Sequence, residues 1–80
     1  MDIGVYHRLL EQYVQEAYDN SDGTPAGIAE HLRSVKPPGR LSRNRGEKQV
    51  ALREAISAFE EHRHWPLDII FSHLGVEIKK

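Results

Sequence analysis

The chain has 80 residues, a net charge of −1 and no cysteine, so its length suits one small domain and excludes a disulfide framework, a thiolate metal site and a cysteine nucleophile. It contains no apolar run near the roughly 20 residues that span a bilayer, and its first residues lack the basic start and apolar run of a signal peptide. We therefore expect a single domain over residues 1–80, located in the cytoplasm.

The first predicted helix covers about residues 3–18. Its apolar side chains recur every three or four residues, as on one face of a helix; they are Tyr6, Leu9, Leu10, Tyr13, Val14, Ala17 and Tyr18. Residues 19–23 are all turn formers, with side chains that are short and polar or absent. Because such polar side chains compete for backbone hydrogen bonds, the helix is expected to stop there.

A second, shorter helix is predicted to begin at Thr24 and Pro25. A threonine oxygen can cap free amides, and proline suits the first helical position because an amide there would have no partner. The narrow apolar stripe of this helix consists of Ile28, Leu32 and Val35. The Lys-Pro-Pro-Gly stretch of residues 36–39 ends the helix, and a basic loop is expected to continue to Gly46.

A third helix is predicted to start with a capping box, in which Asn44 and Glu47 each bond a free amide of the first turn. Apolar residues then continue at helical spacing to Phe59, and alanines at 51, 55 and 58 raise the helix propensity. This segment has the strongest helical pattern in the chain.

A fourth helix is expected to follow a break at residues 62–65, with Pro66 as its first residue. Gly75 is suited to end this helix in a left-handed conformation. Residues 76–78 alternate as a strand would, but the chain contains no second strand to pair with them. We therefore expect an extended tail packed on the core.

Together these elements predict an all-α fold, a compact bundle of about four short helices with a basic loop containing proline and glycine between the second and third helices. The aromatic residues at helical spacing are expected to build the core. Tyr18, at the end of the first helix, and Trp65, beside a proline in a junction, are the two that we expect to be partly exposed and to contact a partner.

The charges of the chain are strongly segregated. Residues 1–32 carry six acidic residues and one arginine, whereas residues 33–53 carry seven basic residues and one glutamate, a net charge of +6. Guanidinium groups pair bidentately with carboxylates and phosphates, so this segment is a candidate for binding an oppositely charged surface. Its predicted partner-binding residues are Arg33, Lys36, Arg40, Arg43, Arg45 and Lys48. The alternative to partner binding is that the loop lies against acidic residues of its own chain or binds nothing.

Nucleic-acid binding through the same segment, residues 33–53, is the second hypothesis for function. Two features weigh against it: the segment contains no aromatic residue for base stacking, and the total charge is close to zero. Residues 28–32 and 71–76 each resemble one half of a helix-turn-helix motif, but neither is followed by a tight turn and a recognition helix.

No metal site, cofactor or catalytic site is predicted. His62 and His64 are two residues apart, so on a helix they point to different sides, and the sequence contains no spaced metal-binding motif. Ser72 and His73 are adjacent and diverge on a helix, which argues against a nucleophile and base pair. We do not expect an enzyme.

The sequence therefore favours a small regulatory or inhibitory protein that binds an acidic surface of a partner protein, with a homodimer as an open alternative. Small helical proteins with this mixture of charges occur among phage and other mobile-element inhibitors, an analogy of size and class only.

Overall fold

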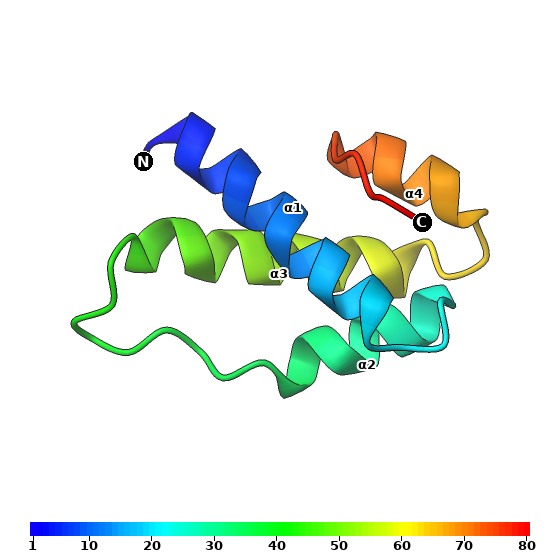
Figure 1. Cartoon of the computed structure of the whole chain (residues 1–80), viewed down its shortest axis with the longest axis horizontal. Coiled ribbons are helices and arrows are strands. Elements are labelled where there is room, and N and C mark those ends of the chain that lie inside the picture. The colour runs from blue at the N-terminus through cyan, green and yellow to red at the C-terminus, as the bar shows by residue number, and fades with distance from the viewer.

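The central element is the long helix α3 (Arg45–Glu61), against which the other helices pack in the computed structural model, which describes all 80 residues (Figure 1). The other three helices are α1 (Ile3–Asp19), α2 (Pro25–Ser34) and α4 (Leu67–Leu74). Helices α1 and α2 also contact each other, and the molecule measures 35 × 23 × 22 Å. The predicted all-α bundle is confirmed. None of the four helices combines the length and the hydropathy that crossing a membrane requires.

The hydrophobic core draws residues from all four helices and from the C-terminal tail, and no polar side chain is buried in it. Phe59 of α3 lies at its centre, fully buried and edge-on to Phe71 of α4, with ring centroids 6.1 Å apart. The small residues Ala51, Ala55 and Ala58 form much of the buried face of α3. Small side chains allow neighbouring helices to approach closely, so one helix can hold three others.

The predicted start of α2 is confirmed at atomic detail. Thr24 is its N-cap, and the Thr24 Oγ1 atom accepts a hydrogen bond of 3.0 Å from the amide of Gly27. At the start of α1, Asp2 has the same role, since its Oδ1 atom accepts a 3.2 Å hydrogen bond from the amide of Val5. Both helices therefore begin where a short polar side chain satisfies a free amide of the first turn.

The predicted capping box at the start of α3 is wrong. Asn44 precedes the helix, but its backbone is left-handed, with φ 56° and ψ 40°, and its side chain makes no capping hydrogen bond. The Glu47 carboxylate accepts a hydrogen bond of 3.2 Å from the amide of Asp2 instead. A contact between distant parts of the chain has therefore replaced the local one, and α3 begins with uncapped amides.

Helix α4 ends as predicted, at Gly75 in a left-handed conformation with φ 73°. The amide of Gly75 donates to the carbonyl of Ser72, and the amide of Val76 donates to the carbonyl of Phe71, each at 3.0 Å. This pair of bonds is a Schellman motif, and the burial of both Phe71 and Val76 supplies its usual apolar contact. At the other end, the N-cap is Pro66, so the helix starts one residue later than predicted.

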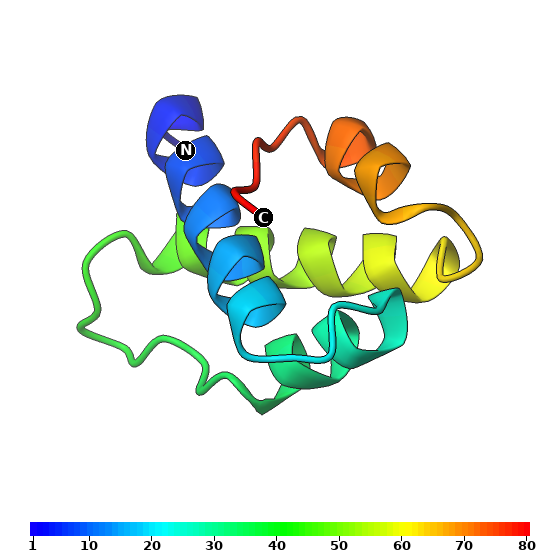
Figure 2. The same ribbon diagram turned by 45° about the vertical axis from the view of Figure 1, so that its right-hand side comes forward.

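The predicted extended tail is also present, and it runs alongside α1 (Figure 2). Val76 is buried and Ile78 packs against the core. Beyond Gly75 the chain forms no helix or strand, and side chains of α1 bond its backbone.

Candidate partner-binding surface

The basic loop connects α2 to α3 through residues 35–44 and bows away from the helices in both ribbon views (Figures 1 and 2). Val35, the residue that caps α2, is already extended, with φ −68° and ψ 130°, and two prolines follow it. Because proline cannot donate a backbone hydrogen bond, this stretch cannot rejoin a helix. The local sequence therefore keeps this connection out of a helix.

The tip of the loop is a β-turn. The amide of Ser42 donates to the carbonyl of Gly39 at 3.0 Å, which places Arg40 and Leu41 at the two central positions of the turn. Leu41 is 97% exposed, more than any other large apolar side chain of the chain, and Arg40 is exposed beside it. A turn of this kind presents one aliphatic and one guanidinium group to solvent at the same point.

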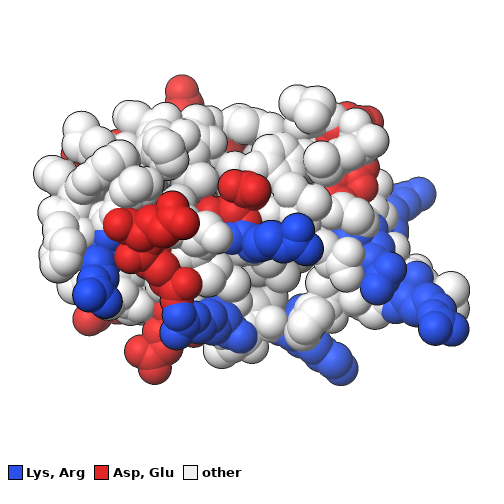
Figure 3. All heavy atoms as spheres, turned by 180° about the vertical axis from the view of Figure 1, so that it is seen from behind, with Lys and Arg blue, Asp and Glu red and all other residues white.

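The arginines in and beside the loop have no carboxylate partner within the chain. Arg40 and Arg43 of the loop and Arg45, the first residue of α3, are exposed, and the two ion pairs of the molecule involve other residues. Figure 3, which shows the face opposite to that of Figure 1, has Lys and Arg along the right side and lower edge, where the loop projects, and most Asp and Glu to the left. The uncapped N-terminus of α3 adds the positive end of a helix dipole to this region.

Lys48 anchors the returning part of the loop. Its Nζ atom donates a hydrogen bond of 2.9 Å to Ser42 Oγ, which fixes the turn against the first turn of α3. Lys36, at the other end of the loop, is exposed and forms no ion pair. The structure thus gathers five predicted residues in and around one loop: Lys36, Arg40, Arg43, Arg45 and Lys48.

Arg33 differs from these five because it is paired within the chain. Its guanidinium group contacts the carboxylate of Glu60, which ties the end of α2 to the C-terminal half of α3. The Arg33 side chain is largely exposed and that of Glu60 is partly exposed, so solvent screens the pair and it contributes little to stability. A guanidinium group already engaged with Glu60 is less available to a partner than those of the loop.

Tyr18 and Trp65 do not lie near the loop. Tyr18 lies in the last turn of α1, is half-buried, and places its ring edge-on to Phe71 with centroids 6.2 Å apart. Trp65 follows the C-terminal end of α3 and is 38% exposed, with its ring stacked on His62 at 3.7 Å between centroids. The 17 residues of α3 span about 25 Å, so Trp65 and the loop lie at opposite ends of the molecule. The predicted residues therefore do not form one continuous surface.

Sequence reasoning missed a hollow at the base of the loop, between α2 and α3. Its volume is about 260 Å³, and one face of α3 contributes four lining residues at helical spacing: Gln49, Leu52, Arg53 and Ile56. The remaining lining residues come from the end of α2 and the start of the loop, namely Leu32, Arg33, Val35, Pro37 and Pro38. The spacing on α3 is visible in the sequence, but the hollow exists only because the two prolines pass beside that face.

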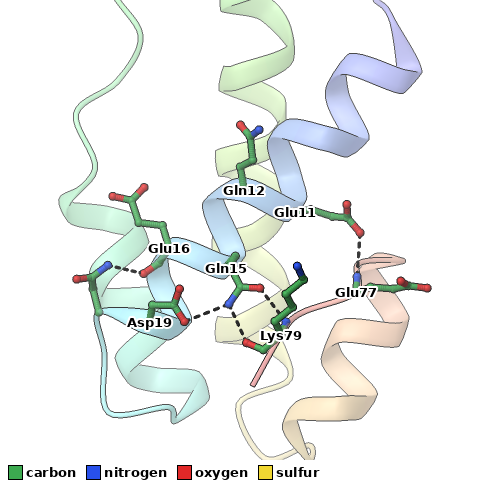
Figure 4. A pocket seen from close by; sticks show the side chains of 8 residues that line it. Glu11, Gln12, Gln15, Glu16, Asp19, Glu77 and Lys79 are labelled. Carbon is green, nitrogen blue, oxygen red and sulfur yellow. Dashed lines mark hydrogen bonds between the residues drawn. The ribbon is translucent and has the colours of Figure 1, made fainter.

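A second hollow, of about 670 Å³, lies between α1 and the tail and is lined by charged and polar residues (Figure 4). Glu11 accepts a hydrogen bond of 2.9 Å from the amide of Glu77, and Gln15 bonds both the amide and the carbonyl of Lys79, at 2.8 and 2.9 Å. Residues 11 and 15 are one helical turn apart on α1. The distance between them matches that between residues 77 and 79, which are two residues apart in the extended tail. This hollow lies along the contact between α1 and the tail.

Three side chains have clearly shifted pKa values, and none of them belongs to the loop. Burial, with a smaller effect of the nearby Glu54 carboxylate, raises the pKa of the Tyr6 hydroxyl, and burial together with Glu16 does the same for the pKa of Tyr13. The hydroxyl of Thr24 lowers the pKa of Asp22, because its hydrogen bond favours the charged carboxylate. All three groups serve local structure.

Two of the five imidazoles, those of His62 and His73, lie together near the junction of α3 and α4. His62 and His73 have ring centroids 5.0 Å apart, and Trp65 contacts both rings. No three His, Asp or Glu side chains are placed to hold a metal ion. Asp68 is ion-paired with Lys80 and has no hydrogen bond to Ser72.

Comparison of the chain with protein-family models, with curated proteins and with solved structures found no match.

Proposed function

We propose that this protein is a non-catalytic regulator or inhibitor that binds an acidic surface of a partner protein through the loop of residues 35–44. The observation that carries the proposal is the turn at its tip, where Leu41 is 97% exposed beside arginines that have no carboxylate partner. An unpaired guanidinium group can form a bidentate pair with a carboxylate. Burial of the leucine would add an apolar contact at the centre of the interface.

The structure of the loop supports binding with a small loss of conformational freedom. The prolines, the β-turn and the bond from Lys48 to Ser42 already restrict the backbone before any partner arrives. A preorganised loop loses less entropy on association than a flexible one. Within this proposal the cysteine-free chain works in the cytoplasm, and a second copy is a further candidate partner.

Nucleic acid is the less favoured ligand for the same loop. No aromatic side chain lies between Arg33 and Arg53, so bases would have no stacking surface there. The carboxylates along α1 and the tail would repel a phosphate backbone that extended beyond the loop. Nucleic-acid binding would appear as an affinity that decreases steeply with salt and depends little on Leu41.

The proposal is tested by comparing two variants that lose the same number of charges. Arg40→Ala/Arg43→Ala/Arg45→Ala removes the two arginines of the loop and the one that follows it at the start of α3, and Arg8→Ala/Arg63→Ala/Lys79→Ala removes three exposed positive charges elsewhere. Affinity capture from the source cells, with quantitative mass spectrometry, should show partners that are lost from the first variant and retained by the second. We expect a decrease of about tenfold or more, because each lost charge-assisted bond contributes about 1.5–3 kcal/mol.

A third variant, Leu41→Ser, separates a protein partner from nucleic acid. It should weaken binding to a protein but leave binding to a labelled oligonucleotide unchanged. Equal capture by the wild type and the loop variant would exclude the loop as the interface.

A further inference from the structure

The hollow at the base of the loop has the size of a site for one side chain. Its volume of about 260 Å³ lies below the roughly 300–1,000 Å³ of pockets that hold small molecules. A single large apolar side chain that fills such a pocket is the usual anchor of a protein interface. The size of the hollow therefore favours an amino-acid side chain over a metabolite.

The lining of the hollow is apolar below and basic at the edge. Leu32 and Leu52 are buried, Val35 and Ile56 are half-buried, and the two prolines complete the wall. Arg53 is exposed at the rim and forms no ion pair. Lys36 lies in the chain between two lining residues and is likewise exposed and unpaired.

We propose that this hollow receives one large apolar side chain from an acidic segment of the partner, and that carboxylates flanking this side chain pair with Arg53 and Lys36. The inference rests on the proposed function and specifies the chemistry that the partner must present. The apolar floor of the hollow favours a large apolar side chain, and its positive rim favours carboxylates on either side of that side chain. A purely acidic segment would leave the floor empty, and a purely apolar segment would leave the rim unpaired.

A second copy of the chain is a poorer occupant than a different protein. On α4 the exposed Ile69 lies next to a carboxylate, that of Asp68, but this group is already paired with Lys80. Nucleic acid also fits poorly, because its phosphates would meet the rim but no apolar side chain would fill the floor. Both remain outcomes of the test below.

The experiment is a titration of the ¹⁵N-labelled protein with two synthetic peptides, followed by NMR. Each peptide is acetylated and amidated and has a run of glutamates around one central residue, which is phenylalanine in the first and alanine in the second. The amides of Gln49, Arg53 and Ile56 should shift on addition of the phenylalanine peptide. This peptide should bind about tenfold more tightly than the alanine peptide, because only its aromatic ring leaves water. Equal affinities for the two peptides, or the absence of binding at millimolar concentration, would overturn the proposal.

Two matched variants locate the binding in the hollow. Gln49→Trp should fill the hollow and weaken the phenylalanine peptide about tenfold, whereas Gln12→Trp, on the exposed side of α1, should not. Circular dichroism checks that both variants fold. If Gln49→Trp does not fold, Arg53→Glu replaces it and should weaken both peptides by a similar factor.

The same titrations separate this inference from the proposed function. If the Arg40→Ala/Arg43→Ala/Arg45→Ala variant loses binding but Gln49→Trp does not, the loop is an interface and the hollow proposal is wrong. If Gln49→Trp loses binding and the loop variant retains it, the hollow proposal stands and the loop is not the interface. Light scattering that shows dimers of the wild type and monomers of Gln49→Trp would assign the hollow to a second copy and overturn the inference.

Discussion

At the scale of single residues, two glycines in the first turns of their helices have opposite roles. A methyl group at Gly27 of α2 would clash with Asp22 Oδ1, which the amide and the hydroxyl of Thr24 hold in place. A methyl group at Gly46 of α3 would have nothing within 4 Å. Gly27 therefore leaves room for a capping network, whereas the structure gives no packing reason for Gly46.

Gly46→Ala should stabilise the protein by about 0.5–1 kcal/mol, because alanine favours helix and restricts the unfolded chain. The same change at Gly27 should be destabilising, because Asp22 must release its hydrogen bonds to Thr24 before the methyl group fits. Urea unfolding followed by circular dichroism measures both effects. In the Asp22→Ala/Gly27→Ala double variant the clash with Asp22 is absent and only a contact of 3.1 Å with Thr24 Oγ1 is left, so most of the penalty of adding the methyl group should disappear. A gain of stability in Gly27→Ala alone would contradict this account.

At the scale of helices and loops, features with a local cause could be predicted from the sequence. The start of α2 at Thr24 and the end of α4 at Gly75 each depend on a few neighbouring residues, and both predictions are confirmed. The capping box predicted at Asn44 is wrong, because the carboxylate of Glu47, its expected partner, bonds an amide 45 residues away along the chain. Such a contact depends on how α1 packs against α3, which no local pattern encodes.

The candidate site follows the same division. An exposed basic loop can be inferred from its prolines and charges, but the sequence left open whether its arginines pair with acidic residues of the same chain. The hollow requires α2, α3 and the loop to be placed together, and the separation of Trp65 from the loop depends on the direction of α3. Neither could be predicted from the spacing of residues alone.

Docking of the tail on α1 is testable because two glutamines of α1 differ in their contacts. Gln15 bonds the backbone of Lys79, whereas the side chain of Gln12 makes no hydrogen bond to the tail. Gln15→Ala should remove protection of the Lys79 amide from hydrogen exchange and cost about 1 kcal/mol of stability. Gln12→Ala should change neither quantity. Unchanged exchange at Lys79 in Gln15→Ala would mean that packing of Ile78 alone holds the tail.

At the scale of the whole molecule, charge is divided between an acidic first helix and a basic loop, and no ion pair joins the two. Attraction between charges that are exposed to solvent without forming a pair is weak, because salt screens it. Along the chain, the nearest charged residues to Arg40 and Arg43 are basic, whereas Arg45 lies between Arg43 and Glu47. No carboxylate forms an ion pair with any of these three arginines. The basic side chains of this region therefore repel one another in the folded protein.

That repulsion leads to a stability prediction that is independent of any partner. The Arg40→Ala/Arg43→Ala/Arg45→Ala variant should be as stable as the wild type or slightly more stable, within about 0.5 kcal/mol. Any gain should be larger at low salt than at high salt, because salt already screens the repulsion in the wild type. Urea unfolding at both salt concentrations measures this difference. Arginines that served the fold would instead cost stability when removed, and a loss of about 1 kcal/mol or more would place them in intramolecular contacts. Unchanged stability together with lost binding would identify them as residues kept for an interface, because they contribute nothing to the isolated chain.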